Sequence, residues 1–235
     1  MKIEVWSDVV CPFCYIGKRK YEAALEQFEY KDEVELVWKS YQLSPEIKTN
    51  PSKTAIQSLA EEKGISLAQA EALTQQVTQR AKEAGLTYRF DKAIAVNTFN
   101  AHRFSHLAKH HGKQNEAEEV LFRSYFSDGE NIDDYSTLIQ LGKEIGLNTD
   151  EVKSVLESDK YADEVQADIY EAYQVDVQSV PFFVFNNRYG VSGAQDVDVF
   201  LKTLERSFRE WKQANEKRPL DVIDGESCSV DGNCK

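Results

Sequence analysis

Two pairs of cysteines carry the most evident chemistry in this sequence. Cys11 and Cys14 stand in the stretch WSDVVCPFCYIG, separated by a proline and a phenylalanine, whereas Cys228 and Cys234 stand near the C-terminus. Two cysteines at the first spacing can form a redox pair or supply half of a structural zinc site, which takes four ligands and usually two such pairs. The elements around the first pair favour one of these two interpretations.

The first pair lies where a predicted strand gives way to a predicted helix. Residues 2–6 alternate polar and apolar side chains, which is typical of a short strand, and residues 33–41 repeat that pattern. Between them, apolar residues recur at helical spacing from a start near Cys11: Tyr21, Ala24, Leu25 and Phe28. Strand, helix and strand together predict a βαβ unit.

This position gives Cys11 a chemical role. Its sulfur would lie beside unpaired backbone N–H groups and the positive end of the helix dipole, which both favour the thiolate. The thiolate is the attacking species in disulfide exchange, and Cys14, one turn later, can resolve the mixed disulfide. A CxxC motif near a βαβ unit is typical of thioredoxin-like redox proteins.

A proline gives a second indication. Pro181 stands directly before the apolar run 182–185, where a proline must open a strand or bend the chain. It is either a trans-proline that opens an edge strand or the cis-proline that faces the cysteines in thioredoxin-like folds. With CxxC at a strand–helix junction we expect cis, which would expose the backbone of Val180 to an extended substrate.

The pattern along the chain predicts an α/β (α+β) protein, a thioredoxin-like fold with a large all-helical insertion. We expect a first thioredoxin-like part at 1–45, a helical insertion at 50–175 and a second thioredoxin-like part at 178–214, followed by a flexible tail at 215–235. Within the insertion, helices are expected near 66–85, 97–111, 115–126, 134–145, 150–158 and 161–174. Ser66 and Gln69 form a capping-box signature at the start of the first of these. In the last part, Asn186 and Asn187 predict a hairpin turn.

Composition excludes several classes of protein. The net charge of −12 disfavours nucleic acid and anionic membranes as partners. No stretch is apolar enough to span a bilayer, and Glu4 and Asp8 interrupt any signal-peptide core. We therefore expect a cytoplasmic protein, in which cysteine pairs are more often catalytic or metal-binding than structural.

Three segments together resemble the DsbA family, and most of all its cytosolic FrnE-like branch, which is named for a dithiol–disulfide isomerase. They are WSDVVCPFCYIG at 6–17, NTFNAHR at 97–103 and SVPFFVFNNRYGVSGAQ at 179–195. The resemblance covers about residues 1–212. It implies a thiol–disulfide oxidoreductase or isomerase in which Cys11 is the nucleophile, Cys14 the resolving thiol and Pro181 the cis-proline.

The resemblance also suggests which other residues meet the substrate. Pro12, Phe13 and Val180 would contact it, and further candidates near the site are Trp6, Asn97 and His102. The sequence departs from the family at one position, because periplasmic oxidants carry histidine where Phe13 stands. Phenylalanine cannot stabilise the thiolate as an imidazolium does, so we expect a less oxidising pair. Kappa-class glutathione transferases and related isomerases remain an alternative on the same fold, although they typically have serine in place of Cys11 and lack Cys14.

The second cysteine pair leaves three interpretations open. Cys228 and Cys234 can exchange with Cys11 and Cys14 as an internal electron shuttle, which the resemblance favours because FrnE-like proteins often end in such a pair. They can instead complete a four-thiolate zinc site with the first pair, or they can be incidental. A structural disulfide between them would close a short loop and stabilise the fold only slightly.

The remaining predictions concern metals, cofactors and partners. All four histidines fall in the helix expected at 97–111, where spacing of four residues could bind zinc; a partly exposed polar face explains them more simply. No motif indicates haem, flavin or an iron–sulfur centre, so we expect no cofactor or resident metal besides the redox-active cysteines. The expected partners are protein or small-molecule disulfides and dithiols, with glutathione as a candidate thiol.

Overall fold

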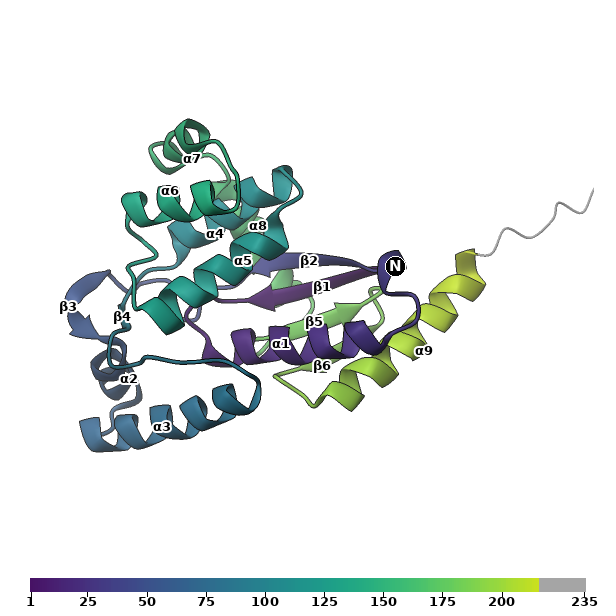
Figure 1. Ribbon diagram of the computed structural model, residues 1–235, viewed down its shortest axis with the longest axis horizontal. Coiled ribbons are helices and arrows are strands. Elements are labelled where there is room, and N and C mark those ends of the chain that lie inside the picture. Colours follow the sequence, from purple (N-terminus) through teal and green to yellow (C-terminus); the bar gives the residue numbers. More distant parts are fainter. Residues whose placement is uncertain (216–235) are drawn as a thin grey trace, which may run out of the picture.

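The computed structural model describes residues 1–215, and its centre is a four-stranded sheet (Figure 1). The strands lie in the order β2-β1-β5-β6. β1 (Lys2–Ser7) runs parallel to β2 (Glu35–Ser40), and α1 (Pro12–Gln27) with the one-turn η1 (Lys31–Glu33) connects them. β5 (Phe182–Phe185) runs antiparallel to β1 and to β6 (Tyr189–Ser192). This topology is the thioredoxin fold, which confirms the predicted fold class.

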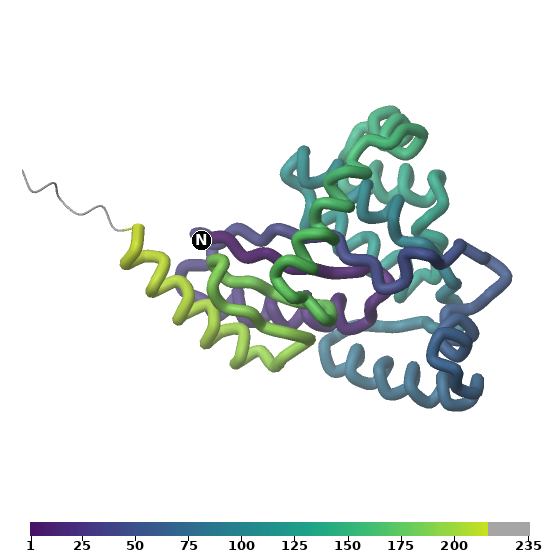
Figure 2. The backbone as a smooth tube through the Cα atoms, turned by 180° about the vertical axis from the view of Figure 1, so that it is seen from behind, coloured from purple at the N-terminus to yellow at the C-terminus, as the bar shows by residue number. Residues whose placement is uncertain are grey.

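Helices cover both faces of the sheet. α9 (Val197–Asn215) packs along α1 on one face, and α8 (Ala162–Gln174) with the segment after it crosses the other (Figures 1 and 2). Aromatic contacts hold α1 to the sheet: the ring centroids of Tyr21 and Phe183 are 5.6 Å apart, and those of Phe183 and Phe200 are 4.9 Å apart. These contacts fix α1, and with it the turn that carries the cysteines.

The chain between β2 and β5 is mostly helical, as expected. Its helices are α2 (Ala55–Lys63), α3 (Leu67–Glu83), α4 (Phe99–His110), α5 (Gln114–Arg123), α6 (Tyr135–Glu144), α7 (Thr149–Leu156) and α8, with the π-helical turn η2 (Ser124–Asp128) after α5. The capping box predicted at Ser66 is present, with Gln69 as its partner. Asn186 and Asn187 have φ of 50° and 51°, as a tight hairpin turn requires.

A small sheet in this region corrects the expectation that 50–175 is all-helical. β3 (Asn50–Thr54) pairs antiparallel with β4 (Ile94–Ala95) as a separate two-stranded sheet. The sequence NPSKT has no alternating apolar residues, so periodicity could not reveal this strand. α2 was not predicted either, although Thr54 and Gln57 form a capping box at its start. α2 and α3 together form an arm below the N-terminal end of α1 (Figure 1).

Candidate active site

Cys11 is the N-cap residue of α1. Its backbone is extended, with φ −83° and ψ 112°, and Pro12 begins the helix. The Cys11 N–H donates to the carbonyl oxygen of Asp8 at 2.9 Å, which closes the turn between β1 and α1. No side chain caps the helix. The Cys11 sulfur therefore lies at the open, positive end of α1, where an anion is favoured.

The strand that begins at Phe182 brings a backbone carbonyl to this sulfur. The Val180–Pro181 peptide bond is cis, and the carbonyl oxygen of Val180 lies 3.5 Å from Cys11 Sγ. Residues 169 positions apart in the chain thus meet because β5 pairs with β1, with Phe182 opposite Trp6. Gly17 allows this approach, since a Cβ there would lie 2.9 Å from Pro181 Cγ.

Cys14 lies behind Cys11 and is fully buried, with no exposed surface. Burial raises the pKa of the Cys14 thiol, and a hydrogen bond with Cys11 and the charge of Cys11 raise it further. The Ser7 hydroxyl and the Asp8 backbone N–H act in the opposite direction and lower that pKa. A negative charge on Cys11 therefore opposes deprotonation of Cys14. When Cys11 enters a mixed disulfide its charge disappears, so deprotonation of Cys14 becomes easier at the step that needs it.

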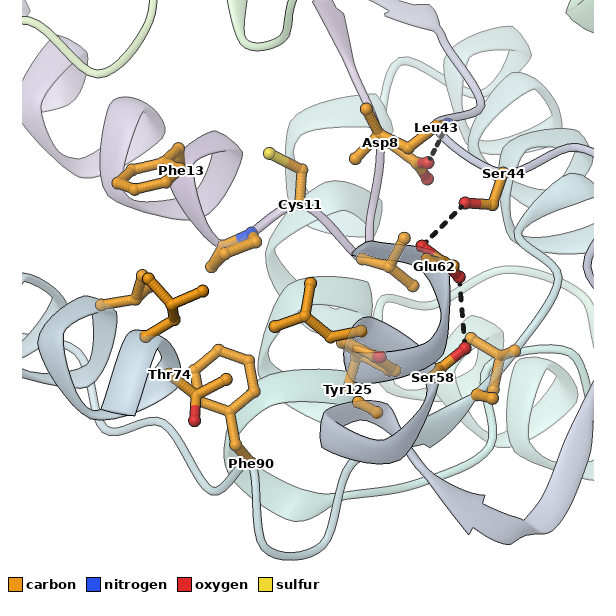
Figure 3. A pocket seen from close by; sticks show the side chains of 18 of the residues that line it. Asp8, Cys11, Phe13, Leu43, Ser44, Ser58, Glu62, Thr74, Phe90 and Tyr125 are labelled. Carbon is orange, nitrogen blue, oxygen red and sulfur yellow. Dashed lines mark hydrogen bonds between the residues drawn. The ribbon is translucent and has the colours of Figure 1, made fainter. Parts of the chain in front are cut away.

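A cavity of about 460 Å³ opens beside Cys11. Cys11 is only 5% exposed, and it lines this cavity together with Pro12 and Phe13. Much of the remaining wall is apolar and comes from α2, α3 and the segment around β4, for example Leu59, Leu73, Val77, Phe90 and Val96. Figure 3 shows Cys11 at one edge of the cavity, with Phe90 and Tyr125 across from it.

A second cavity, of about 690 Å³, lies on the other side of Phe13. It is bounded by α1, by Val180 and by the segment 193–197 that leads into α9. Arg80 at the end of α3 lines both cavities, and its guanidinium carbon lies 5.9 Å from the Phe13 ring centroid. Phe13 and Arg80 thus line both spaces, but Cys11 lines the first one alone.

Tyr88 is a site residue that the sequence did not reveal. Its hydroxyl donates to the carbonyl oxygen of Pro12 at 2.7 Å, and its ring stacks on Phe126 with centroids 4.5 Å apart. Burial and the nearby thiols of Cys11 and Cys14 raise the pKa of Tyr88. Tyr88 follows α3 in an irregular segment, where no periodicity or motif marked it. Its hydrogen bond anchors the first turn of α1.

Two of the four histidines differ from the expected partly exposed face, whereas His110 and His111 are exposed. His102 and His106 are 2% and 6% exposed, because α4 is packed between the sheet and other helices. His102 Nε2 lies 3.0 Å from the carbonyl oxygen of Tyr41 and 3.4 Å from Asp8 Oδ1. Burial lowers the pKa of His102, but the nearby Asp8 carboxylate, with the charge of Glu118 and the Tyr41 carbonyl oxygen, outweighs it and raises that pKa overall. Within residues 1–215 no group of three or more potential ligands could hold a metal ion.

The other sequence candidates have mainly supporting contacts. The indole N–H of buried Trp6 donates to the carbonyl oxygen of Asp168 at 2.9 Å. The Asn97 amide donates to the carbonyl oxygens of Pro45 and Ile47 at 3.0 and 2.9 Å, which anchors the loop that carries Ile47 into the cavity wall. Neither Asn97, Trp6 nor His102 is among the residues that line either cavity.

Two predictions concern the ends of the chain and its surroundings. The predictions for Cys228 and Cys234 concern a tail at 215–235, of which only Asn215 is among the described residues. Among the helices of the described part of the chain, none is long and apolar enough to span a membrane.

Comparisons with known proteins agree with this geometry. The DSBA-like thioredoxin domain family matches residues 2–205. The uncharacterized protein YwbO of Bacillus subtilis is 31% identical over 214 residues, which cover 86% of this chain and 94% of that protein. The crystal structure of the probable DsbA oxidoreductase SCO1869 from Streptomyces coelicolor superposes with a TM-score of 0.83 at 38% identity, covering 100% of this chain and 98% of that one.

A more distant structure shares the fold alone. The cytosolic disulfide reductase DsbM from Pseudomonas aeruginosa, solved with GSH, has a TM-score of 0.63 at 14% identity and covers 89% of this chain and 100% of its own. The family match over most of the chain is the stronger finding, and it agrees with the cysteine turn and the strand that faces it. This chain belongs to the DsbA-like thioredoxin family of thiol–disulfide oxidoreductases.

Proposed function

We propose that the chain catalyses dithiol–disulfide exchange through Cys11 and Cys14, as a reductase or isomerase rather than a strong oxidant. The observation that carries this proposal is the position of Cys11 Sγ, at the N-terminus of α1 and 3.5 Å from the Val180 carbonyl oxygen. The position between the cysteines that carries histidine in strong oxidants is Phe13 here. This supports a reductase or isomerase, because no positive charge between the cysteines stabilises the reduced pair.

The reaction balances with these residues alone. The Cys11 thiolate attacks a substrate disulfide, forms a mixed disulfide and releases one substrate thiolate. Cys14 then loses its proton, attacks Cys11 and displaces the second substrate thiolate. The enzyme is left with a Cys11–Cys14 disulfide, the substrate has gained two electrons, and the proton of Cys14 is available to the released thiolate. The reverse sequence oxidises a dithiol.

The same proposal extends to location and partners. We place the protein in the cytoplasm as a FrnE-like member that acts on protein or small disulfides, with glutathione as the thiol that regenerates it. The cytosolic disulfide reductase solved with GSH shares the fold and so supports this choice by analogy only. Glutathione transferase and isomerase chemistry of the kappa class is disfavoured here because both Cys11 and Cys14 are present.

A redox titration tests the proposal directly. The Cys11–Cys14 couple is equilibrated with glutathione buffers of known potential, and insulin reduction is measured for the wild type and for Cys11→Ser. We expect a single two-electron transition and loss of insulin reduction in Cys11→Ser, whereas Cys14→Ser should accumulate a mixed disulfide. Full activity in Cys11→Ser would overturn the assignment of the nucleophile.

The shuttle role of Cys228 and Cys234 is a separate part of the proposal. Cys228 is thirteen residues beyond Asn215, a length of chain that can span about 43–47 Å when extended. α9 itself, which runs along α1, is 19 residues and about 28 Å long. An extended chain of this length is longer than α9, and the shuttle requires it to return towards Cys11. Unchanged turnover in the Cys228→Ser, Cys234→Ser double variant would remove the shuttle, and anaerobic zinc titration with thiol counting would detect the alternative four-thiolate site.

A further inference from the structure

The cavity beside Cys11 has an acidic wall. Asp8 is 1% exposed and lines the cavity; its Oδ2 accepts the Leu43 N–H at 2.8 Å, but its Oδ1 accepts no hydrogen bond within the described residues. Glu62, from α2, lines the same space. Its two carboxylate oxygens accept only from serine hydroxyls, Ser58 at 3.2 Å and Ser44 at 3.5 Å. Figure 3 shows these groups together on one side of the cavity.

Neither carboxylate of this wall is paired with a lysine or an arginine. Within residues 1–215 no such ion pair is formed by Asp8 or Glu62, although Lys63 also lines the cavity, and His102 Nε2 lies 3.4 Å from Asp8 Oδ1. Both carboxylates also act on Tyr125, which lines the cavity: burial raises the pKa of Tyr125, and the charges of Asp8 and Glu62 raise it further. A buried carboxylate oxygen with no hydrogen bond is costly, so a donor from a ligand would relieve it.

The rest of the cavity wall determines which ligands fit. The wall between Phe13 and Tyr125 is largely apolar, and a volume of about 460 Å³ is larger than a single long side chain needs. Lysine and arginine pack their aliphatic stems on apolar surface while the charged head reaches polar groups. Arg80 lines the cavity on the Phe13 side, so a cationic head is repelled there and attracted towards Asp8 and Glu62.

We propose that this cavity is a subsite for a lysine or arginine side chain next to the reactive cysteine of a polypeptide substrate. The inference rests on the proposed exchange activity at Cys11, a residue that lines the same cavity. The aliphatic stem lies on the apolar wall and the cation lies between Asp8 and Glu62. Polypeptides that carry a basic residue beside a disulfide are then the preferred substrates.

Three matched peptide disulfides test the subsite. Each is a symmetric disulfide of an acetylated, amidated Gly-Cys-X peptide, with X as lysine, norleucine or glutamate. The rate at which each oxidises the reduced protein is divided by its rate with dithiothreitol, which removes differences in intrinsic reactivity. We expect the lysine peptide to react about three- to fivefold faster than the norleucine peptide, the size of a partly exposed ion pair, and the glutamate peptide to be slowest.

Two variants assign the preference to the cavity. Glu62→Gln should reduce the lysine preference, measured as the ratio of the lysine rate to the norleucine rate, to near unity. Glu61→Gln is the matched control, because Glu61 neighbours Glu62, pairs with Lys53 and lies outside the cavity lining, and it changes net charge equally. It should keep the full preference.

The outcomes separate the subsite from the activity on which it rests. Equal normalised rates for the three peptides, a preference for glutamate, or a lysine preference that survives in Glu62→Gln overturns the subsite and leaves the exchange activity intact. Failure of the reduced wild type to react with any of the peptides overturns the proposed function and the subsite with it.

Discussion

Two histidines one helical turn apart on α4 form buried pairs with carboxylates, His106 with Asp168 of α8 and His102 with Asp8 in the turn after β1. The two pairs differ in how fully their hydrogen bonds are satisfied. Asp168 Oδ2 accepts from the Ser40 N–H at 2.9 Å and lies 3.0 Å from His106 Nε2, while Asp168 Oδ1 lies 3.1 Å from Lys39 Nζ. By contrast, Asp8 leaves Oδ1 without a hydrogen bond and faces the cavity that holds Cys11.

The difference indicates that one pair stabilises the fold and the other belongs to the active-site surroundings. Buried polar networks with every oxygen paired are expected to contribute to stability and to a unique packing, whereas an unpaired buried group points to a ligand or a reaction. We therefore regard the Asp168–His106 pair as structural and the Asp8–His102 pair as part of the active-site surroundings. Substitutions in the two pairs should therefore differ in their effects on stability and on activity.

The largest effect is expected at Asp168. Asp168→Ala leaves Lys39, His106 and the Ser40 N–H without their shared partner, and breaking a buried charge pair typically costs about 3–5 kcal/mol in the free energy of unfolding. Asp8→Asn should cost less, since an amide oxygen still accepts from the Leu43 N–H. Urea denaturation measures both, and Asp168→Asn provides a milder variant if Asp168→Ala does not fold. A larger loss at Asp8 than at Asp168 would contradict the comparison.

The pH dependence of stability should separate the two pairs next. The raised pKa of His102 means that its pairing with Asp8 stabilises the fold fully below the ordinary value of 6.5 and loses this contribution as pH rises through the raised value. Burial raises the pKa of Asp168, but the hydrogen bonds from His106 and the Ser40 N–H, together with the charge of Lys39, lower it overall. Its contribution is therefore present above its ordinary value of 3.8 and lost as pH falls through the lowered one.

His102→Gln tests the first half of that statement. Below pH 6.5 the variant should be less stable than the wild type by about 1.5–3 kcal/mol, as for a hydrogen bond to a charged group, and the difference should shrink as the pH rises. The charge of Glu118 acts in the same direction as that of Asp8, so Glu118→Gln serves as a control for its part. A difference that is constant from pH 5.5 to 9 would show that His102 does not change protonation with folding.

A matched pair of glycines extends the comparison from polar groups to packing. A Cβ at Gly17 would lie 2.9 Å from Pro181 Cγ, and one at Gly142 would lie 2.8 Å from Val152 Cγ2. Both alanine variants should lose about 1–3 kcal/mol of stability through overpacking. Only Gly17→Ala should also slow disulfide exchange, because it separates Pro181 and Val180 from Cys11. Equal exchange rates in the two folded variants would contradict this role of Gly17.

Features that depend on neighbouring residues in the chain could be predicted from the sequence, whereas features that depend on distant elements could not. Local patterns predicted the strand–helix turn at Cys11, the helices from α4 to α8 and the cap at Ser66, because each depends on periodicity or capping within a few residues. The roles of Asp8, Glu62 and Tyr88 could not be predicted, since they depend on which distant elements meet at the cavity. The burial of His102 and His106 was missed for the same reason: a helical wheel does not show that other helices and the sheet cover two sides of α4.

The smallest expected effects come from two single hydroxyl groups. Tyr88→Phe removes the hydrogen bond to the Pro12 carbonyl oxygen at 2.7 Å, and Ser40→Ala removes the contact between Ser40 Oγ and His106 Nε2 at 3.2 Å. Each should cost about 0.5–1.5 kcal/mol of stability, the usual net value of one hydrogen bond. The rate of Cys11 alkylation should change in Tyr88→Phe alone, because Pro12 begins the helix that holds the sulfur and Ser40 belongs to the structural pair. If Ser40→Ala altered that rate as much as Tyr88→Phe, both histidine pairs would have to be counted as active-site surroundings.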